Sequence, residues 1–216
     1  MKVAVVVDGE AESRCASALL AHPRVELVGL VGVNPPASWG HRATRTEDGS
    51  GFDIVVGPGA AASLARSSGA VLVVTGPPPD DGPTVSFAGP EGLARALAAG
   101  LDEGASVALT IPGAPVRGGE RVAFPAPLGW VMATRETGSD IFVAPVEGPL
   151  AAVAAFDRRR IRAILDDRLF LAGACLAAGA LAALGTRGPV WTRPDPYLAA
   201  VEDLGLVVAE SLSGRP

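Results

Sequence analysis

Residues 3–32 read VAVVVDGEAESRCASALLAHPRVELVGLVG, and this stretch decides the fold class. It opens with an unbroken apolar run, Val3–Val7, which is typical of a strand buried on both faces of a parallel sheet. A polar turn interrupts the run, and Ala11–Ala21 then favours a helix. A second apolar run follows at Val25–Val33. The order strand, helix, strand predicts a right-handed crossover between parallel strands.

The alternation continues along the chain. Asn34–Gly51 is polar and rich in glycine, proline and serine, so a loop is expected there. Two further strands, Asp53–Val56 and Ala70–Thr75, flank an expected helix at Ala60–Arg66. The predicted fold class is therefore α/β, with a Rossmann-like doubly wound parallel sheet in residues 1–112.

The pattern changes near residue 112, where Pro112–Gly119 has the composition of a loop. Short strands with possible hairpin links follow, and residues 113–216 are expected to form a smaller α+β domain that serves dimerisation or substrate binding. The expected elements from residue 91 onward are a helix at Glu91–Leu101, strands at Ser106–Ile111, Arg121–Phe124, Trp130–Thr134, Ile141–Pro145, Leu150–Phe156 and Ile161–Leu165, an Ala/Gly-rich buried helix from near Leu169, and a last helix at Tyr197–Leu212.

Composition excludes several classes of protein. The formal net charge of −5 argues against a general nucleic-acid or anionic membrane surface. The only lysine is Lys2, which removes the P-loop lysine and most Schiff-base chemistry. Cys15 and Cys175 lack metal-ligand spacing, so no metal site is predicted. The apolar run Leu169–Leu184 is shorter than the roughly 20 residues of a membrane span, and no signal peptide is recognised, so a cytoplasmic protein is expected.

Two stretches resemble the glucose–fructose oxidoreductase and inositol dehydrogenase family of NAD(P)-dependent enzymes, or the related short dihydrodipicolinate reductase and aspartate dehydrogenase group. The first is residues 3–32, quoted above. The second is GLARALAAGLDEGASVALTIPGAP, residues 92–115, which is similar to the helix and strand before the family's Glu-Lys-Pro motif. The resemblance implies a Rossmann domain that binds NAD or NADP and an oxidoreductase that acts on a small metabolite.

The dinucleotide fingerprint of that family is largely replaced. Its three glycines allow a tight turn, a close approach to the pyrophosphate and close packing of helix on strand. On the resemblance, these places hold Val7, Gly9 and Glu12. Glu12 would set a carboxylate beside the diphosphate at the helix N-terminus, where an anionic ligand is normally favoured.

The other family residues are replaced as well. Gly32, with Asn34 nearby, stands where the acid that binds the adenosine ribose is expected, and Ile111 stands at the catalytic lysine. No histidine follows His41. The resemblance therefore implies a degenerate relative whose catalytic residues are unknown.

Candidate cofactor-binding residues follow the predicted strands. Asp8 and Gly9 form either an ordinary turn or a remnant of a phosphate loop, and the turn is the better-supported reading. After the strands Asp53–Val56 and Ala70–Thr75, ordinary loop residues and ligand-binding residues are about equally supported. The residues concerned there are Gly57, Gly59, Thr75 and Gly76.

A basic cluster lies in the loop after the second strand. His41, Arg42 and Arg45 are more often a solvated surface than an anion site, but Arg42 or Arg45 could pair with the 2′-phosphate of NADP. Arg158–Arg160, with Arg162, is read mainly as a solvated hairpin tip and less often as an anion or partner site. Asp166 or Asp167 is read as a helix cap.

Two functional hypotheses remain open at this stage. In the first, the chain no longer transfers hydride and acts as a binding or subunit protein that forms a homo-oligomer or joins a partner. In the second, it is an active NAD(P)-dependent oxidoreductase that holds its cofactor by unusual contacts. The missing glycines, ribose acid and lysine favour the first.

Overall fold

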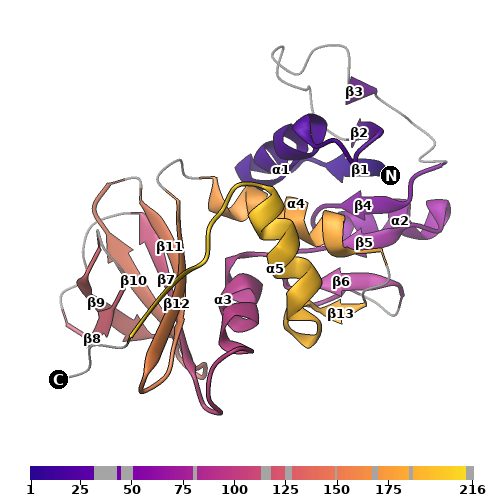
Figure 1. The fold of residues 1–216 in the computed structure, drawn as a ribbon. Coiled ribbons are helices and arrows are strands. Elements are labelled where there is room, and N and C mark those ends of the chain that lie inside the picture. The colour runs from indigo at the N-terminus through magenta and orange to yellow at the C-terminus, as the bar shows by residue number, and fades with distance from the viewer. Residues whose placement is uncertain are drawn as a thin grey trace.

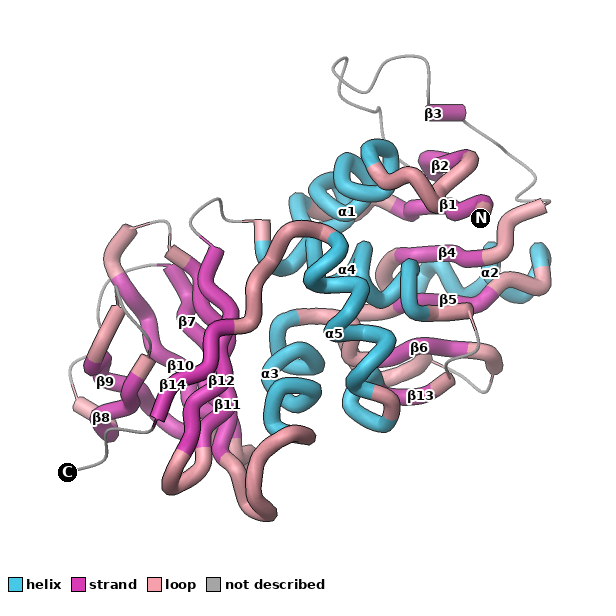
Figure 2. The backbone as a smooth tube through the Cα atoms, viewed as in Figure 1, coloured by secondary structure: helices cyan, strands magenta, loops and turns pink. Residues whose placement is uncertain are grey.

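The computed structural model describes residues 1–31, 43–44, 51–79, 82–112, 118–124, 128–148, 150–166, 170–184 and 187–212. These residues form two seven-stranded sheets, with helix α3 between them and the other helices around the first sheet (Figure 1). Figure 2 shows the same arrangement with helices and strands separated by colour. In the described ranges, every helix is too short or too polar to cross a membrane.

The first sheet has the strand order β13-β6-β5-β4-β1-β2-β3, and its described pairings are all parallel. The chain runs outward from β1 to β2 and β3, then returns to place β4 on the other side of β1. This reversal is the doubly wound topology that the apolar runs predicted. The strands are β1 (Lys2–Val6), β2 (Leu27–Val31), β3 (Ala43–Thr44), β4 (Ile54–Val56), β5 (Val71–Val73), β6 (Thr84–Ser86) and β13 (Gly188–Pro189).

Helices cover both faces of this sheet. The core on one face joins residues of α1 (Glu10–Ala21), α3 (Pro90–Ala98), α4 (Leu171–Ala182) and α5 (Pro194–Asp203). The other face packs against α2 (Ala62–Ser68), which follows the short 3-10 helix η2 (Gly59–Ala61). Because most of these contacts come from Ala, Val and Leu, the layers depend on close backbone approach.

Helix α4 shows this close approach best. All its residues from Gly173 to Ala182 are buried, as expected for an Ala/Gly-rich helix that is apolar all round. A Cβ on Gly173 would lie 2.9 Å from the Cys15 nitrogen and 3.0 Å from the Ala11 oxygen of α1. A Cβ on Gly179 would lie 3.0 Å from Val73 Cγ1. Glycine at these two positions therefore lets α4 lie against α1 and β5.

The second sheet has the order β14-β12-β11-β7-β10-β9-β8. Its described pairings are antiparallel except that β7 and β10 run parallel. One face contributes to the main core and the other forms a separate apolar cluster around Phe142 and Phe156. The strands are β7 (Ser106–Pro112), β8 (Glu120–Ala123), β9 (Trp130–Arg135), β10 (Ile141–Val146), β11 (Ala151–Phe156), β12 (Arg160–Asp166) and β14 (Ala209–Leu212).

The prediction of a last helix over Tyr197–Leu212 is wrong at both ends. Helix α5 begins at Pro194, whose fixed φ suits a first helical turn, and ends at Asp203. Gly205 has φ +84° and donates its N–H to the Glu202 carbonyl at 2.8 Å, which stops the helix. The chain then forms β14 at the edge of the second sheet.

The two sheets do not correspond to two consecutive halves of the chain. Strand β7 lies in the second sheet, while β13, α4 and α5 return to the first. The strand that resembled the lead-in to the Glu-Lys-Pro motif is thus not part of the parallel sheet. A boundary between independently folding units at residue 112 stays a prediction.

Candidate functional site at the carboxyl edge of the parallel sheet

The carboxyl ends of the parallel strands point toward the second sheet (Figure 1). Val5, Val56 and Val73 are register partners across β1, β4 and β5, so these strands end at nearly the same level. The strand order reverses between β1 and β4. Open α/β sheets bind their ligands outside this edge and at such a reversal, which makes it the candidate site.

The structure brings together the predicted residues that follow β4 and β5. The Gly57 N–H donates to the Val73 carbonyl at 3.1 Å, and the Phe87 N–H donates to the Gly76 carbonyl at 3.1 Å. A Cβ on Gly89, which caps α3, would lie 3.5 Å from the Thr75 Cβ. The loops after β4, β5 and β6 therefore form one continuous rim.

Gly57 has a packing reason to be glycine. It is buried, and a Cβ there would lie 2.8 Å from Val6 Cβ and 3.0 Å from the Val6 oxygen. Among the described residues, a Cβ on Gly59 would meet only Pro79, at 3.9 Å. Close approach of the β1 and β4 ends explains Gly57, whereas Gly59 is open to a ligand.

The N-terminus of α1 carries the third part of the rim. Gly9 is the N-cap and provides no side-chain cap, while Glu10 and Glu12 lie in the first turn. Glu12 folds back so that its Oε2 is 3.3 Å from the position of a Cβ on Gly9. Glu10 pairs with Arg14 at 2.9 Å, and Asp8 is exposed. Carboxylates therefore stand where the helix dipole would favour an anionic ligand.

The predicted basic anchors Arg42 and Arg45, with His41, lie outside the described residues. The other histidine, His22, is the C-cap of α1 and so lies at the opposite end of this helix from Gly9. It therefore lies away from the carboxyl edge.

The second sheet presents a partly exposed apolar row on its face toward the first sheet, in which Ile111 is exposed and the other members are half-buried. Ile111 pairs with Pro145 in β10, and by the β9–β10 register Met132 follows across β9. Their face is that of Leu109 and Val143, which pack on the main core. Ile111 is 51% exposed. The position of the family's lysine is thus an accessible apolar side chain.

Three groups that could act as nucleophiles or acids are buried instead. Burial raises the pKa of Cys175 to about 12, and burial with a smaller contribution from Glu12 raises the pKa of Cys15 further. Burial likewise raises the pKa of Tyr197 well above its usual range, and its hydroxyl donates to the Cys175 carbonyl at 3.4 Å. These groups stay neutral in the core. Within the described ranges, no group of three His, Cys, Asp or Glu side chains is placed to hold a metal.

An aromatic cluster at the β6 and β13 ends was not predicted. Phe87 has φ +56°, a left-handed conformation that is uncommon for a residue other than glycine. Its ring lies 4.8 Å from that of Trp191, and the Arg95 guanidinium lies 5.3 Å over the same indole. Arg95 also bonds Glu91 at 3.0 Å and Asp140 at 3.1 Å. The cluster joins α3 to the turn before β10 in the second sheet.

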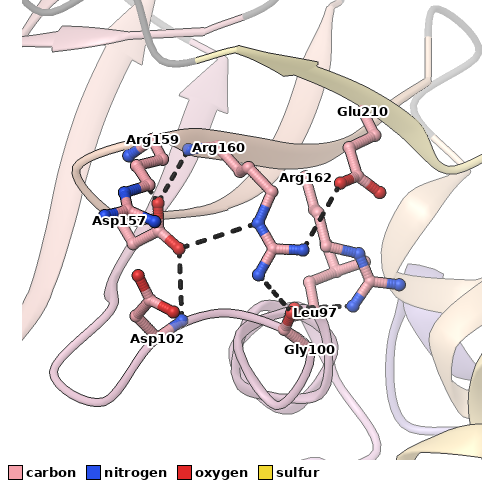
Figure 3. Close-up of polar contacts among 8 residues, drawn as sticks. All are labelled: Leu97, Gly100, Asp102, Asp157, Arg159, Arg160, Arg162 and Glu210. Carbon is pink, nitrogen blue, oxygen red and sulfur yellow. Dashed lines mark hydrogen bonds and ion pairs between the residues drawn. The ribbon is translucent and has the colours of Figure 1, made fainter.

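The arginines after β11 serve a structural contact. Arg160 donates to the Gly100 carbonyl at 3.0 Å and Arg162 to the Leu97 carbonyl at 2.9 Å, at the C-terminal end of α3 (Figure 3). Cationic side chains stabilise this negative helix end. The reading of a solvated hairpin tip therefore fits the exposed Arg158 but not these two arginines.

Asp157 closes the same hairpin turn. Its carboxylate accepts N–H bonds from Arg159 at 2.6 Å, Arg160 at 2.7 Å and Asp102 at 3.1 Å (Figure 3). These bonds, led by that from Arg159, hold the pKa of this carboxyl below its usual value. At the other end of β12, Asp166 accepts the Phe170 N–H at 2.8 Å. Phe170 is itself the N-cap of α4 and no side chain caps this helix, so the prediction of Asp166 or Asp167 as the N-cap is wrong.

No family model matches the sequence, and no curated protein matches it. Among solved structures, a dipicolinate-bound dihydrodipicolinate reductase from Paenisporosarcina sp. TG-14 has 10% identity and a TM-score of 0.48 over 89% of this chain and 99% of that one. A myo-inositol dehydrogenase from Corynebacterium glutamicum has 12% identity and a TM-score of 0.44 over 100% of this chain and 99% of its own. A UDP-N-acetylglucosamine 3-dehydrogenase from Acidithiobacillus ferrooxidans has 12% identity and a TM-score of 0.41 over 89% and 99%.

The first two are of the classes that the sequence resemblance named.

Proposed function

We propose that this chain is a relative of the NAD(P)-dependent oxidoreductases that no longer transfers hydride and acts as a binding or subunit protein. The observation that carries the proposal is the Glu12 carboxylate at the N-cap of α1, where a dinucleotide would place its diphosphate. Like charges about 4 Å apart repel by about 4 kcal/mol at an effective dielectric constant of 20. Solvent around the half-buried Glu12 reduces this, and even about 1.4 kcal/mol weakens binding tenfold.

The chemistry of the rim supports the loss of catalysis. Ile111 offers no proton, and the thiols and phenol of the described core are buried with raised pKa values. Thr110 is also engaged, because its Oγ1 accepts the Ala152 N–H at 2.6 Å between β7 and β11. Among these described side chains, none is therefore given a role in hydride transfer.

Calorimetric titration with NADH and NADPH tests the proposal. We expect dissociation constants near or above about 1 mM for both, and a gain of about tenfold in Glu12→Gln, which removes the charge but keeps the size. Glu10→Gln is the matched control, since Glu10 is in the same helical turn but is paired with Arg14. Micromolar binding of either cofactor to the unaltered chain would overturn the proposal.

An active NAD(P)-dependent oxidoreductase is the second candidate. It is favoured by the carboxyl edge of the parallel sheet, which faces the second sheet (Figure 1), since open α/β sheets bind their ligands at this edge. Arg42 and Arg45 are then the proposed anchors for the 2′-phosphate of NADP. Micromolar binding of NADPH alone, lost in the Arg42→Ala, Arg45→Ala double variant, would support this candidate.

We also propose that the chain self-associates through the second sheet. Trp130 is 43% exposed and Ile111 51%, and both stand on strands of that sheet. Large exposed apolar side chains on one sheet are common at subunit contacts. Light scattering at high concentration tests this, and a strict monomer would exclude it. The cytoplasmic location expected from the sequence stays a prediction.

A further inference from the structure

A cavity away from the carboxyl edge lies where three helix ends meet. It has a volume of about 510 Å³ and is lined by the C-terminal ends of α1 and α5 and by Phe170 at the start of α4. This volume is within the usual range for small-molecule sites, about 300–1,000 Å³. None of the residues discussed for the dinucleotide contributes to its lining.

The cavity holds charges of both signs. Arg24 Nη2 and Asp203 Oδ2 are 2.9 Å apart, although the two residues are far apart in the chain. This contact engages one of the guanidinium nitrogens and one carboxylate oxygen. Both side chains are more than half exposed, at 53% and 56%, so a ligand in the cavity can reach them. The pair therefore offers both a donor for an anionic group and an acceptor for a cationic one.

His22 adds a second donor. The Arg24 N–H donates to His22 Nδ1 at 3.2 Å, which makes Nδ1 the acceptor and places the proton of the neutral ring on Nε2. Burial, followed by the Arg24 charge, lowers the pKa of His22 against an opposing effect of Asp203. The ring is thus neutral near pH 7 and carries its N–H on Nε2, and His22 is one of the residues that line the cavity.

The helix ends add a negative field. Helices α1 and α5, both fully described, have no basic residue in their last turns. Their terminal carbonyl groups therefore favour a cation, as Asp203 does. Apolar surface from Ala18, Phe170 and Leu204 completes the lining.

From this arrangement we propose that the cavity binds a small aliphatic α-amino acid as its zwitterion. The ligand carboxylate lies against Arg24 and the His22 Nε2–H, and its ammonium lies against Asp203 and the carbonyl ends of α1 and α5. The aliphatic side chain rests on Ala18, Phe170 and Leu204. A ligand with a single charge would form an ion pair with Arg24 or with Asp203, but not with both.

Titration calorimetry with L-leucine tests the assignment, with two analogues as controls. 4-Methylpentanoate lacks the ammonium group, and 3-methylbutylamine lacks the carboxylate. We expect L-leucine to bind with a Kd of about 1 mM and each analogue at least about tenfold more weakly. At tenfold excess of L-leucine over this Kd, the Tm should rise by about 3–5 °C. No heat with L-leucine up to about 20 mM, or equal binding of 4-methylpentanoate, would overturn the proposal.

Variants then locate the site. Arg24→Gln and Asp203→Asn should each weaken L-leucine binding at least about tenfold, since each removes the partner of one ligand charge. Arg14→Gln is the matched control, because it opens an ion pair of comparable length, Arg14–Glu10, away from the cavity. Unchanged binding in both cavity variants would place leucine elsewhere and refute the assignment. The comparison of leucine with its analogues uses the unaltered chain and so decides the chemistry even if a variant does not fold.

Discussion

Substitution of Gly173 by alanine tests the packing that holds α4 against α1. In an ordinary helix this change gains about 1 kcal/mol, because alanine is the better helix former. Here the new Cβ would lie 2.9 Å from the Cys15 nitrogen and 3.0 Å from the Ala11 oxygen, and closer still to Arg14 Cβ. Carbon atoms need about 3.5–4.0 Å from their neighbours, so two backbone atoms of α1 must move.

The balance of the two effects sets the expected result. Overpacking costs about 1–3 kcal/mol, and a clash with helix backbone belongs at or above the upper end. After the helix-forming gain, we expect Gly173→Ala to lower the free energy of unfolding by about 2 kcal/mol. For a chain of this length that is a fall in Tm of about 4–8 °C. Thermal and urea unfolding followed by circular dichroism, at one protein concentration, measure both quantities.

The neighbouring residue provides the control. Ala172→Gly, in the same turn of α4 and only partly buried, should lose about 1 kcal/mol through helix propensity alone. A rise in Tm for Gly173→Ala would show that α1 and α4 do not meet as closely as described. The sign of the change therefore decides whether the glycine is required by the helix contact.

Three further predictions concern buried polar groups. Ser86 is 1% exposed and its Oγ has no hydrogen-bond partner among the described residues, so Ser86→Ala should raise the free energy of unfolding by about 1 kcal/mol. Thr110→Val should instead lower the free energy of unfolding by about 1–3 kcal/mol, because it leaves the Ala152 N–H without its acceptor at 2.6 Å. If both variants lowered the free energy of unfolding, Ser86 would have a hydrogen-bond partner. The lowered pKa of Asp157 means that its carboxylate stabilises the fold above the ordinary carboxyl pKa of about 4 and ceases to do so as the pH falls through the lowered value. The stability difference between the unaltered chain and Asp157→Asn, measured by urea unfolding, should therefore be largest near pH 7 and shrink below about pH 4, and a difference independent of pH would contradict the role of the ionised carboxylate.

The early strands could be predicted from the sequence because burial on both faces of a parallel sheet requires continuous apolar runs. Strands β6 and β13 were not, since they have three and two residues and follow proline- and glycine-rich segments. Gly188 joins β13 to Val85 of β6 across about a hundred residues, and no local pattern encodes that pairing. The end of α5 was encoded by Leu204-Gly205, but the apolar residues beyond it extended the predicted helix into what is strand β14.

The candidate site could also be predicted from the sequence in part. The rule that ligands gather after parallel strands predicted the loops that contain Gly57 and Thr75, and the structure brings these loops together. The roles within them depend on tertiary contacts. Gly57 is fixed by its distance from Val6, and the Phe87–Trp191 contact requires β13 to lie beside β6.

The same turn of α1 that carries Glu12 is also the surface against which α4 packs. Gly173 approaches Ala11 and Cys15, one residue before and three residues after Glu12, so this part of the helix is held by the core and has little freedom to move. The packing therefore restrains the backbone that carries Glu12, at the helix end where the dipole favours a carboxylate. Glu12→Gln should leave that backbone unchanged and relieve only the charge, whereas loosening the contact through Gly173→Ala should not by itself increase affinity for NADPH. If Gly173→Ala bound NADPH more tightly than Glu12→Gln, a movable helix rather than the carboxylate would be what keeps the diphosphate out.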